Sequence, residues 1–501
     1  MEPTPPDPVE TDDGSWRDPL RLDVGELLGP QGLPASRRAF LLGGAGLGLG
    51  LALTGGVSRP TAASPVRSAG LGGLVPDPKK RLSLPAGFSY RIVAEAGVTE
   101  LAGAAKGEKT PGTQDGSASF RHPGGGYLLV TNHECNPDMT EHLVPPVKGW
   151  TYDRGAPGGT TTVQVDGKGR RVSELVSLAG THTNCAGGPT PWGTWLSCEE
   201  TEARKGEGGL TKNHGYVFEV NPRNNRANRD PKPILALGRF AHEAAAVDPA
   251  TGQIYLTEDA ASPLGLLYRF TPPRRFRGLG AGTLRQLGGA AGTLSAMRAL
   301  DSRGRVVRDL SVAHKPGITY RVEWIEVPDR DAVSVSTRKQ FAYDGMKGKA
   351  VTRSRKLEGA WWSRGGAYIV ASYAKPADDG SAAAHEGQVW FLDPRRGTLA
   401  LVLWFAPRKS KDKGVDGPDN IAVSPFGGVI LAEDGVGAQH LISAAADGSR
   451  VFLARNEVRD GAEYSEFTGP NFSYDRRFLF ANVQTPGTVF AIRGPFGQLA
   501  R

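Results

Sequence analysis

Acidic residues recur at a nearly constant spacing along this 501-residue chain. Glu199 follows Cys185 by 14 residues, and three further pairs repeat that interval to within one residue. The interval fits a tight antiparallel hairpin, in which the first residue of one strand and the last residue of its partner lie at the same end. If the hairpins surround one axis, these side chains converge. The further pairs are Glu243 and Glu258, Glu358 and Ser372, and Asp419 and Glu433.

Convergence of these side chains would build two stacked rings at one mouth. We expect the first ring to contain Cys185, Glu243, Glu358 and Asp419, and the second to contain Asn132, Glu199, Glu258 and Glu433. Further acids stand nearby in the sequence: Glu134, Glu200, Asp259, Glu326, Asp416 and Asp434. Two carboxylates about 4 Å apart repel each other by about 4 kcal/mol at an effective dielectric constant of about 20. The mouth must therefore bind cations or keep most of its acids protonated.

Any single acidic pair is also explained as the solvated end of a strand. The repeated acidic ending at Glu199, Glu258 and Glu433 favours a metal site instead, because the partner positions, including Glu243 and Asp419, are acidic as well.

The donor types indicate which metals the mouth would hold. Many carboxylate oxygens, with the amides of Asn420, Asn471 and Asn482, suit Ca²⁺ or Mg²⁺, and a crowded ligand set favours Ca²⁺. A thiolate among them calls for a transition ion such as iron. Cys185 occupies the register position of the acids and is the thiolate candidate, whereas Cys198 aligns with small strand residues and is predicted to be a packed thiol.

Short strands are the elements that must position these residues. The chain contains 68 Gly and 37 Pro, which weaken the interiors of both helices and strands and suit many short strands joined by turns. We expect an all-β fold, a six-bladed β-propeller with insertions, of which the longest lies near residues 270–340. Six second strands of hairpins support it: Tyr127–Thr131, Thr194–Cys198, Gln253–Thr257, Ala367–Ala371, Gly428–Ala432 and Arg477–Ala481.

Residues 1–70 have the layout of a leader and linker. Arg37 and Arg38 precede an uncharged, Gly-rich stretch from Phe40 to Leu53, as in a twin-arginine export signal. We expect export by the twin-arginine machinery to the periplasm, the cell surface or the medium, with an uncleaved membrane anchor as the alternative. Residues 71–501 would then form the propeller catalytic domain. The net charge of +8 is diffuse and lacks interleaved aromatics, so we expect no nucleic-acid partner, and we expect a monomer.

Several motifs resemble the signature of the PhoX-type alkaline phosphatases. They are the segment from Thr181 to Glu200, Asn132-His133-Glu134, Gly238 to Glu243, Leu357 to Trp362, Asp416 to Asn420, and Glu433-Asp434-Gly435. The resemblance implies a six-bladed propeller, phosphomonoester hydrolysis outside the cytoplasm, and an Fe³⁺ and Ca²⁺ cluster held by one cysteine and several acids. Together with the acids of the mouth, it predicts these metal ligands: Glu134, Cys185, Glu199, Glu200, Glu243, Glu258, Glu358, Asp419 and Glu433.

The expected reaction is the hydrolysis of small phosphate esters by a metal-bound hydroxide or oxide. Metal ions neutralise the acids, bind phosphate oxygens and stabilise the charge of the transition state. No catalytic residue outside the metal cluster is then needed, and the chain has no G-x-S-x-G elbow. Asn420 and Lys347 are candidate substrate contacts, although an exposed hairpin lysine also explains Lys347.

Two other kinds of function fit a calcium-binding propeller. A calcium-dependent lactonase or phosphodiesterase would contain calcium without stoichiometric iron. A non-catalytic, calcium-stabilised binding propeller would bind metal without turning over any phosphate ester.

Overall fold

The computed structural model describes residues 71–274, 279–341, 350–374, 384–408, 414–445, 447–461 and 463–500. Within these ranges the chain forms β-strands and short 3₁₀ turns, with no α-helix, which confirms the expected all-β class. No helix in the described ranges has the length and apolar character needed to span a membrane. The predicted leader and Lys347 lie outside the described residues.

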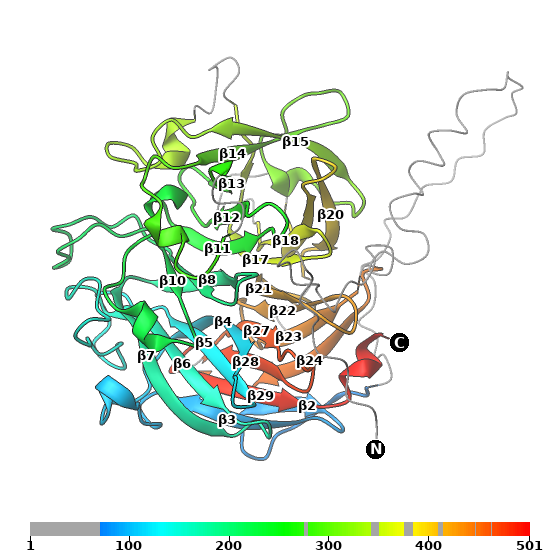
Figure 1. Ribbon diagram of the computed structural model, residues 1–501. Coiled ribbons are helices and arrows are strands. Elements are labelled where there is room, and N and C mark those ends of the chain that lie inside the picture. Colours follow the sequence, from blue (N-terminus) through cyan, green and yellow to red (C-terminus); the bar gives the residue numbers. More distant parts are fainter. Residues whose placement is uncertain are drawn as a thin grey trace, which may run out of the picture.

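Six strands contact one another in cyclic order around a central axis. Their labels lie together in the middle of Figure 1. Each is the first strand of an antiparallel hairpin, so the ring is made entirely of inner strands. In order, the strands are β4 (Gln114–Arg121), β8 (Asn184–Pro189), β11 (His242–Val247), β17 (Leu357–Ser363), β21 (Pro418–Val423) and β27 (Phe467–Phe472). The molecule is therefore a propeller of strands that radiate from this ring.

The second strand of every hairpin lies where the sequence predicts one, to within two residues at each end. Local turn chemistry explains the spacing. Between β11 and its partner, the Asp248 carboxylate accepts hydrogen bonds from Ala250 N (2.8 Å) and Thr251 Oγ1 (2.7 Å), which closes a short turn. The second strands are β5 (Tyr127–His133), β9 (Trp195–Glu199), β12 (Ile254–Glu258), β18 (Gly366–Ala371), β22 (Val429–Glu433) and β28 (Leu479–Val483).

Outer strands extend these hairpins into larger sheets. The long insertion contributes strands that join the sheets of β11 and β17 into one, through the pair β15 and β20, so its predicted place is correct. The outer strands are β6 (Gly158–Val165), β7 (Arg171–Thr181), β10 (Val217–Val220), β13 (Gly265–Thr271), β14 (Thr293–Leu300), β15 (Thr319–Glu326), β16 (Arg353–Ser354), β19 (Gly387–Asp393), β20 (Thr398–Phe405), β23 (His440–Ala444), β24 (Arg450–Asn456) and β29 (Thr488–Arg493), with the separate pair β25 (Arg459–Asp460) and β26 (Glu463–Tyr464).

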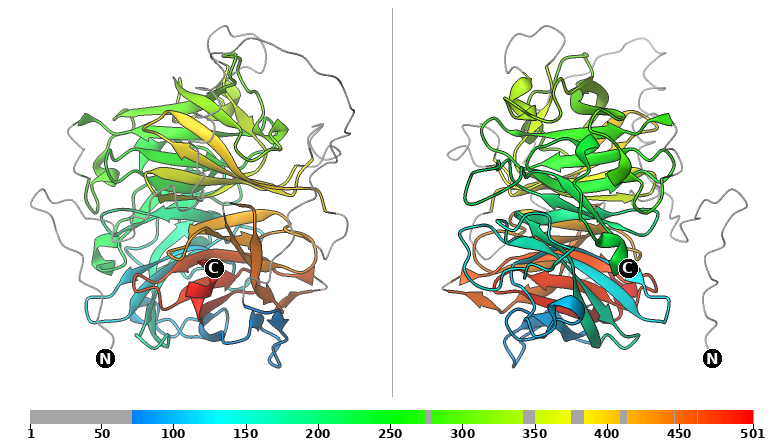
Figure 2. Two further views of the ribbon diagram at one scale, coloured as in Figure 1. Left: turned by 90° about the vertical axis from the view of Figure 1, so that its right-hand side faces the viewer. Right: turned by 60° about the vertical axis from the view of Figure 1, so that its left-hand side comes forward.

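The two ends of the described chain meet in the last sheets. Strand β3 (Ser89–Glu95) pairs with β29. Strand β2 (Leu82–Pro85) pairs with β24 and, on its other edge, with β1 (Leu74–Val75). Figure 2 shows the blue N-terminal strands beside the red C-terminal strands. An N-terminal strand thus completes the sheet that the C-terminal strands begin, and this pairing closes the ring.

Apolar side chains fill the spaces between neighbouring sheets. Between the first and last sheets, for example, Val93, Leu129, Val163, Phe480 and Ala491 pack together with at most 1% exposure. At about 25 cal/mol per Å² of apolar surface removed from water, such contacts supply most of the stabilisation that holds the sheets around the axis. The polar residues of the axis depend on this packing for their positions.

Candidate metal centre at the mouth of the propeller

Each of the six inner strands carries a β-bulge at the same place. Between β8 and β9 the register passes from the pair Asn184 and Glu199 to the pair Gly187 and Ser197, so two residues of β8 oppose one of β9. A bulge bends its strand and re-aims the side chain at the bend. The bulged residues are Asp115 and Gly116, Cys185 and Ala186, Glu243 and Ala244, Glu358 and Gly359, Asp419 and Asn420, and Gly469 and Pro470.

Glycine or alanine follows four of the re-aimed side chains, where neighbouring bulges meet backbone to backbone. A Cβ on Gly116 would lie 2.6 Å from the Cα of Ala186, and a Cβ on Gly359 would lie 2.9 Å from the Cα of Asn420. Glycine at these two positions therefore lets the inner strands approach closely enough to bring their bulges together.

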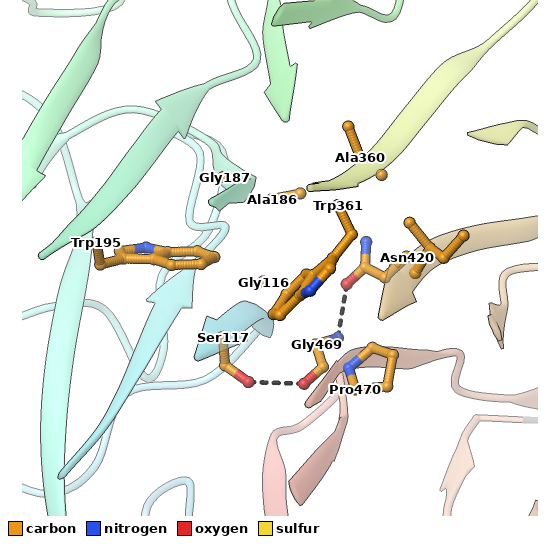
Figure 3. Close-up of a pocket in the computed structure, with 12 residues that line it drawn as sticks. Gly116, Ser117, Ala186, Gly187, Trp195, Ala360, Trp361, Asn420, Gly469 and Pro470 are labelled. Atoms are coloured by element: carbon orange, nitrogen blue, oxygen red, sulfur yellow. Dashed lines mark hydrogen bonds between the residues drawn. The ribbon is translucent and has the colours of Figure 1, made fainter. Parts of the chain in front are cut away.

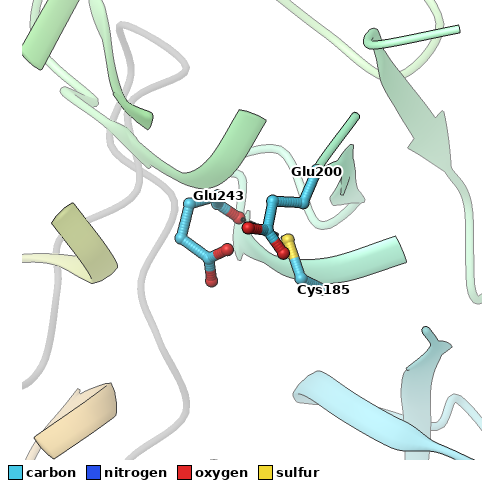
Figure 4. A group of neighbouring side chains, drawn as sticks. All are labelled: Cys185, Glu200 and Glu243. Carbon is cyan, nitrogen blue, oxygen red and sulfur yellow. Dashed lines mark hydrogen bonds between the residues drawn. The ribbon is translucent and has the colours of Figure 1, made fainter. Parts of the chain in front are cut away.

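Three overlapping groups of donors form at the mouth. In each group, one ligand atom per residue lies within 4.8 Å of the others. Glu243 belongs to the first two groups and Asp419 to the last two, so the groups form one continuous series. They are Cys185, Glu200 and Glu243; Glu243, Glu358 and Asp419; and Asp419, Asp434 and Glu466. Figure 4 shows the first group, in which the Cys185 sulfur and the two carboxylates face one another.

The four residues of the predicted first ring, Cys185, Glu243, Glu358 and Asp419, all belong to this series. Hairpin spacing therefore predicted their relative places correctly. Asp115, the bulged residue of the first inner strand, was missed because the first hairpin was aligned on Asn132. In the structure it is His133, one residue later, that pairs with Gln114, the residue before Asp115. At Ser372 the shift of one residue has the opposite direction, because the paired residue is Ala371, one residue earlier.

Three acids of the predicted second ring lie one residue away from the acids that face the mouth. Glu199, Glu258 and Glu433 belong to none of the three groups, and each is buried and hydrogen-bonded to strands or loops beside its own hairpin. Because successive side chains point to opposite sides of a strand, the residue that follows each of them turns toward the mouth instead. Those residues are Glu200, Asp259 and Asp434.

The amides of the predicted site fasten strands together. Asn132 Nδ2 donates to the main-chain oxygens of Cys185 (2.8 Å) and Ala186 (2.7 Å). Asn420 Oδ1 accepts from Gly469 N at 2.6 Å, and Asn420 Nδ2 donates to Asp419 Oδ1 at 2.9 Å. Asn420 is 4% exposed, so its amide holds an acid of the mouth in place.

The hydrogen bond from Gly469 N to Asn420 Oδ1 lies beside a cavity on the axis, behind the bulges (Figure 3). Its walls are small residues of the inner strands and the indoles of Trp195 and Trp361, with no titratable side chain. This cavity therefore offers no group for acid, base or metal chemistry, in contrast to the mouth.

Burial and mutual repulsion raise the pKa of the acids of the mouth. The pKa of Asp419 and that of Glu134 rise to about 7, first because of burial and then because acids face them. Burial also raises the pKa of the Cys185 thiol, and the Glu243 carboxylate beside it adds to the effect. Asp115 is 5% exposed, and its Oδ1 has no hydrogen-bond partner among the described residues. Such a site has an unmet demand for positive charge.

Lys356 supplies one positive charge at the mouth, and no pattern in the sequence indicated this lysine. Its Nζ lies 3.1 Å from Glu358 Oε1 and 3.1 Å from Asp259 Oδ2. The attraction of Glu358 raises the pKa of Lys356, so the ammonium form is favoured. The spacing of ligands does not point to a cation two residues before one of them. Glu466 was missed because it precedes β27 and lies outside the hairpin register.

A family model described as alkaline phosphatase PhoX matches residues 69–487. The chain belongs to the PhoX family of alkaline phosphatases. The resemblance seen in the sequence motifs is thereby confirmed, and membership of PhoX makes the chain a phosphatase. Among curated proteins, no relative of this sequence is found.

Several solved structures align with this chain, to different degrees. A structure described as Pseudomonas fluorescens PhoX in complex with vanadate, a transition state analogue, aligns with a TM-score of 0.61 at 18% identity, over 83% of this chain and 97% of that one. A gluconolactonase from Xanthomonas campestris aligns with a TM-score of 0.32 at 12% identity, over 79% and 99% of the two chains. The PQQ domain of a pyranose dehydrogenase from Coprinopsis cinerea aligns with a TM-score of 0.33 at 10% identity, over 83% and 98%.

The residues present fit the metal dependence that PhoX membership implies. Three groups of carboxylates share members, one group includes a thiol, and a buried carboxylate oxygen of Asp115 lacks a partner among the described residues. Carboxylates so close together are stable as anions only when cations lie among them.

Proposed function

We propose that this PhoX-family protein is a metal-dependent phosphomonoesterase that uses Fe³⁺ and Ca²⁺ at the mouth of a six-bladed propeller. The observation that carries the proposal is the series of three donor groups, because one of its ends contains a thiol and the rest is all carboxylate. The ring of six inner strands supports the blade count, since each inner strand begins one blade.

Ligand chemistry distributes the two metals along the series. Cys185, with Glu200 and Glu243, offers the soft thiolate that iron accepts and calcium does not. The groups around Glu358 and Asp419 offer only oxygen, which suits Ca²⁺. When bound, such ions attract phosphate oxygens and lower the pKa of water at the site.

The chain's own side chains then have distinct tasks. Lys356 presents a positive charge against the acids, where it would attract a doubly charged phosphate ester and help to orient it. Asn420 helps to fix the direction of the Asp419 carboxylate by donating a hydrogen bond to Asp419 Oδ1.

The proposed location is outside the cytoplasm. Arg37 and Arg38, followed by an uncharged Gly-rich stretch, support export by the twin-arginine machinery to the periplasm, the cell surface or the medium. We propose a monomer that acts on small-molecule phosphate esters without nucleic acid, in which residues 71–501 form one catalytic domain and Lys347 reaches the substrate.

A phosphatase assay coupled to elemental analysis tests the proposal. Purified holoenzyme should hydrolyse p-nitrophenyl phosphate, contain iron and calcium, and lose activity to a chelator. Cys185→Ala should lose iron and activity together, whereas Cys198→Ala, which removes a buried thiol outside the donor groups, should keep both. Calcium without iron, accompanied by lactone or diester hydrolysis, would overturn the assignment. So would metal binding without any turnover.

A further inference from the structure

Four acids of the mouth share one feature of sequence and structure: each directly follows a fully buried polar residue. The buried member of each pair is at most 1% exposed, and its side chain is hydrogen-bonded to strands or loops beside its own hairpin rather than to groups of the mouth. The pairs are His133 and Glu134, Glu199 and Glu200, Glu258 and Asp259, and Glu433 and Asp434.

Glu199 is the most heavily bonded of the four. Its Oε1 accepts from His182 N at 2.9 Å and lies 2.7 Å from His214 Nδ1, while its Oε2 accepts from Gly215 N (2.9 Å) and Tyr216 N (3.0 Å). The other ring nitrogen of His214 lies 3.3 Å from Asp153 Oδ2. Glu199 therefore fills its acceptor sites without reaching the mouth.

The other three residues are also hydrogen-bonded away from the mouth, each to different partners. Glu258 accepts from Tyr268 Oη at 2.8 Å and from Arg338 Nη1 at 3.0 Å. Glu433 accepts from Asp416 N at 2.8 Å and lies 2.8 Å from His440 Nδ1. The ring nitrogens of His133 lie 2.8 Å from Gly112 O and 2.9 Å from Thr161 Oγ1.

The remaining two hairpins supply a contrast. In one, the paired residue is Ala371, and Ser372 follows it. In the other, the paired residue is Asn482, and Val483 follows it. The Asn482 side chain donates to the main-chain oxygen of Asp115 in the neighbouring inner strand. Buried residues held by hydrogen bonds to strands and loops beside their own hairpin thus accompany acids that face the mouth.

We propose that Glu199, Glu258, Glu433 and His133 are positioning residues that aim the following acids into the mouth. Each is the last residue of its strand. Successive side chains of a strand point to opposite faces, so fixing the first side chain on one face directs the second to the other face. This role rests on the proposed metal-dependent function.

The test follows cobalt binding by metal-stripped protein, because a thiolate bound to Co²⁺ absorbs in the near ultraviolet and so reports on Cys185. Glu199→Gln leaves Cys185, Glu200 and Glu243 in place, yet we expect Co²⁺ affinity to fall about 10- to 100-fold, as when an outer-sphere partner of a metal ligand is lost. His214→Leu should reproduce the loss. His214→Gln retains an N–H donor for Glu199 and should largely restore affinity.

Glu219 provides a matched control in the same sheet. It is 8% exposed, and its carboxylate accepts from Trp192 Nε1, Thr194 Oγ1 and Gly282 N at 2.8 to 3.0 Å, but no acid follows it. Glu219→Gln should lower the thermal stability of the metal-free protein and leave Co²⁺ affinity unchanged.

The outcomes separate the two proposals. Wild-type affinity in Glu199→Gln, or an equal loss of affinity in Glu219→Gln, overturns the positioning role and leaves the metal centre intact. If Glu199→Gln does not fold, the comparison of His214→Leu with His214→Gln decides, because both retain Glu199. Failure of the wild type to bind Co²⁺ through Cys185 overturns the proposed metal centre itself.

Discussion

Lys356 Nζ lies 3.1 Å from Glu358 Oε1, which puts a lysine inside a cluster of acids. A cation at this place balances charge that the bulged acids create by their convergence. It also gives the mouth a group that prefers anionic ligands such as phosphate esters. Its effect can be measured separately from that of the acids, because lysine is not a metal ligand in its ammonium form.

Replacing Lys356 by Met should weaken phosphate-ester turnover. A hydrogen bond to a charged group contributes about 1.5 to 3 kcal/mol, so kcat/KM for p-nitrophenyl phosphate should fall about 10- to 100-fold. Lys356→Arg retains the charge and should lose less. Steady-state kinetics at saturating metal checks this, and an unchanged kcat/KM in Lys356→Met would show that the lysine only neutralises the acids.

The metal-free protein should lose stability as the pH rises from about 4 to above 7. The pKa of Asp419 and that of Glu134 are about 7 in the folded protein, above their usual values near 4. The folded state therefore holds protons that the unfolded state releases, and this stabilisation disappears as the pH passes through the raised pKa values. Thermal unfolding of chelator-treated protein at several pH values measures the effect. Added Ca²⁺ should remove most of the pH dependence, and a flat profile without metal would contradict the raised pKa values.

Gly359→Ala should disturb the mouth through the backbone. The new methyl would lie 2.9 Å from Asn420 Cα and 2.9 Å from Asp419 O, and neither atom can move without shifting a bulge. Overpacking of this kind costs about 1 to 3 kcal/mol of stability. Urea unfolding would measure the loss, with Gly167→Ala as the control because a Cβ there would meet no atom within 4 Å among the described residues. Equal stability of the two variants would argue against close packing of the bulges.

Arg338→Met should destabilise the protein strongly. Arg338 pairs with the buried Glu258 at 3.0 Å and with Glu202 at 2.7 Å, and its loss strands the Glu258 charge. Removing one partner of a buried pair costs about 3 to 5 kcal/mol. Adding Glu258→Gln to Arg338→Met should recover part of that loss in a denaturation experiment. Additive losses in the double variant would show that the two side chains act independently.

Much of the fold could be predicted from the spacing of residues along the chain. The interval from Cys185 to Glu199 reports a hairpin length, and hairpin length depends on local turn residues such as Asp248 that the sequence displays. The interval identified Cys185 and Glu243 as neighbours across two blades, because each bulge occurs at the same distance from its turn.

The direction of the side chains at strand ends was harder to predict. Glu199 and Glu200 are the same residue type at adjacent positions, and only the donors around Glu199, such as His214 and the main-chain N–H of Gly215, decide which of them turns inward. Those donors lie 15 to 17 residues away and outside the hairpin that contains Glu199, so the pattern within the hairpin does not reveal them. Lys356 was missed for the same reason, because its partner Asp259 lies in another blade.

The pairing of β3 with β29 also sets the order in which the molecule can be completed. Strand β3 is among the first parts of the propeller to be synthesised, and its partner is among the last, so β3 must wait with an unpaired edge until synthesis is nearly finished. Asp115 and Gly469 become neighbours on the axis only when the ring closes. The mouth therefore cannot assemble on a nascent chain, and metal should be acquired only by the full-length protein.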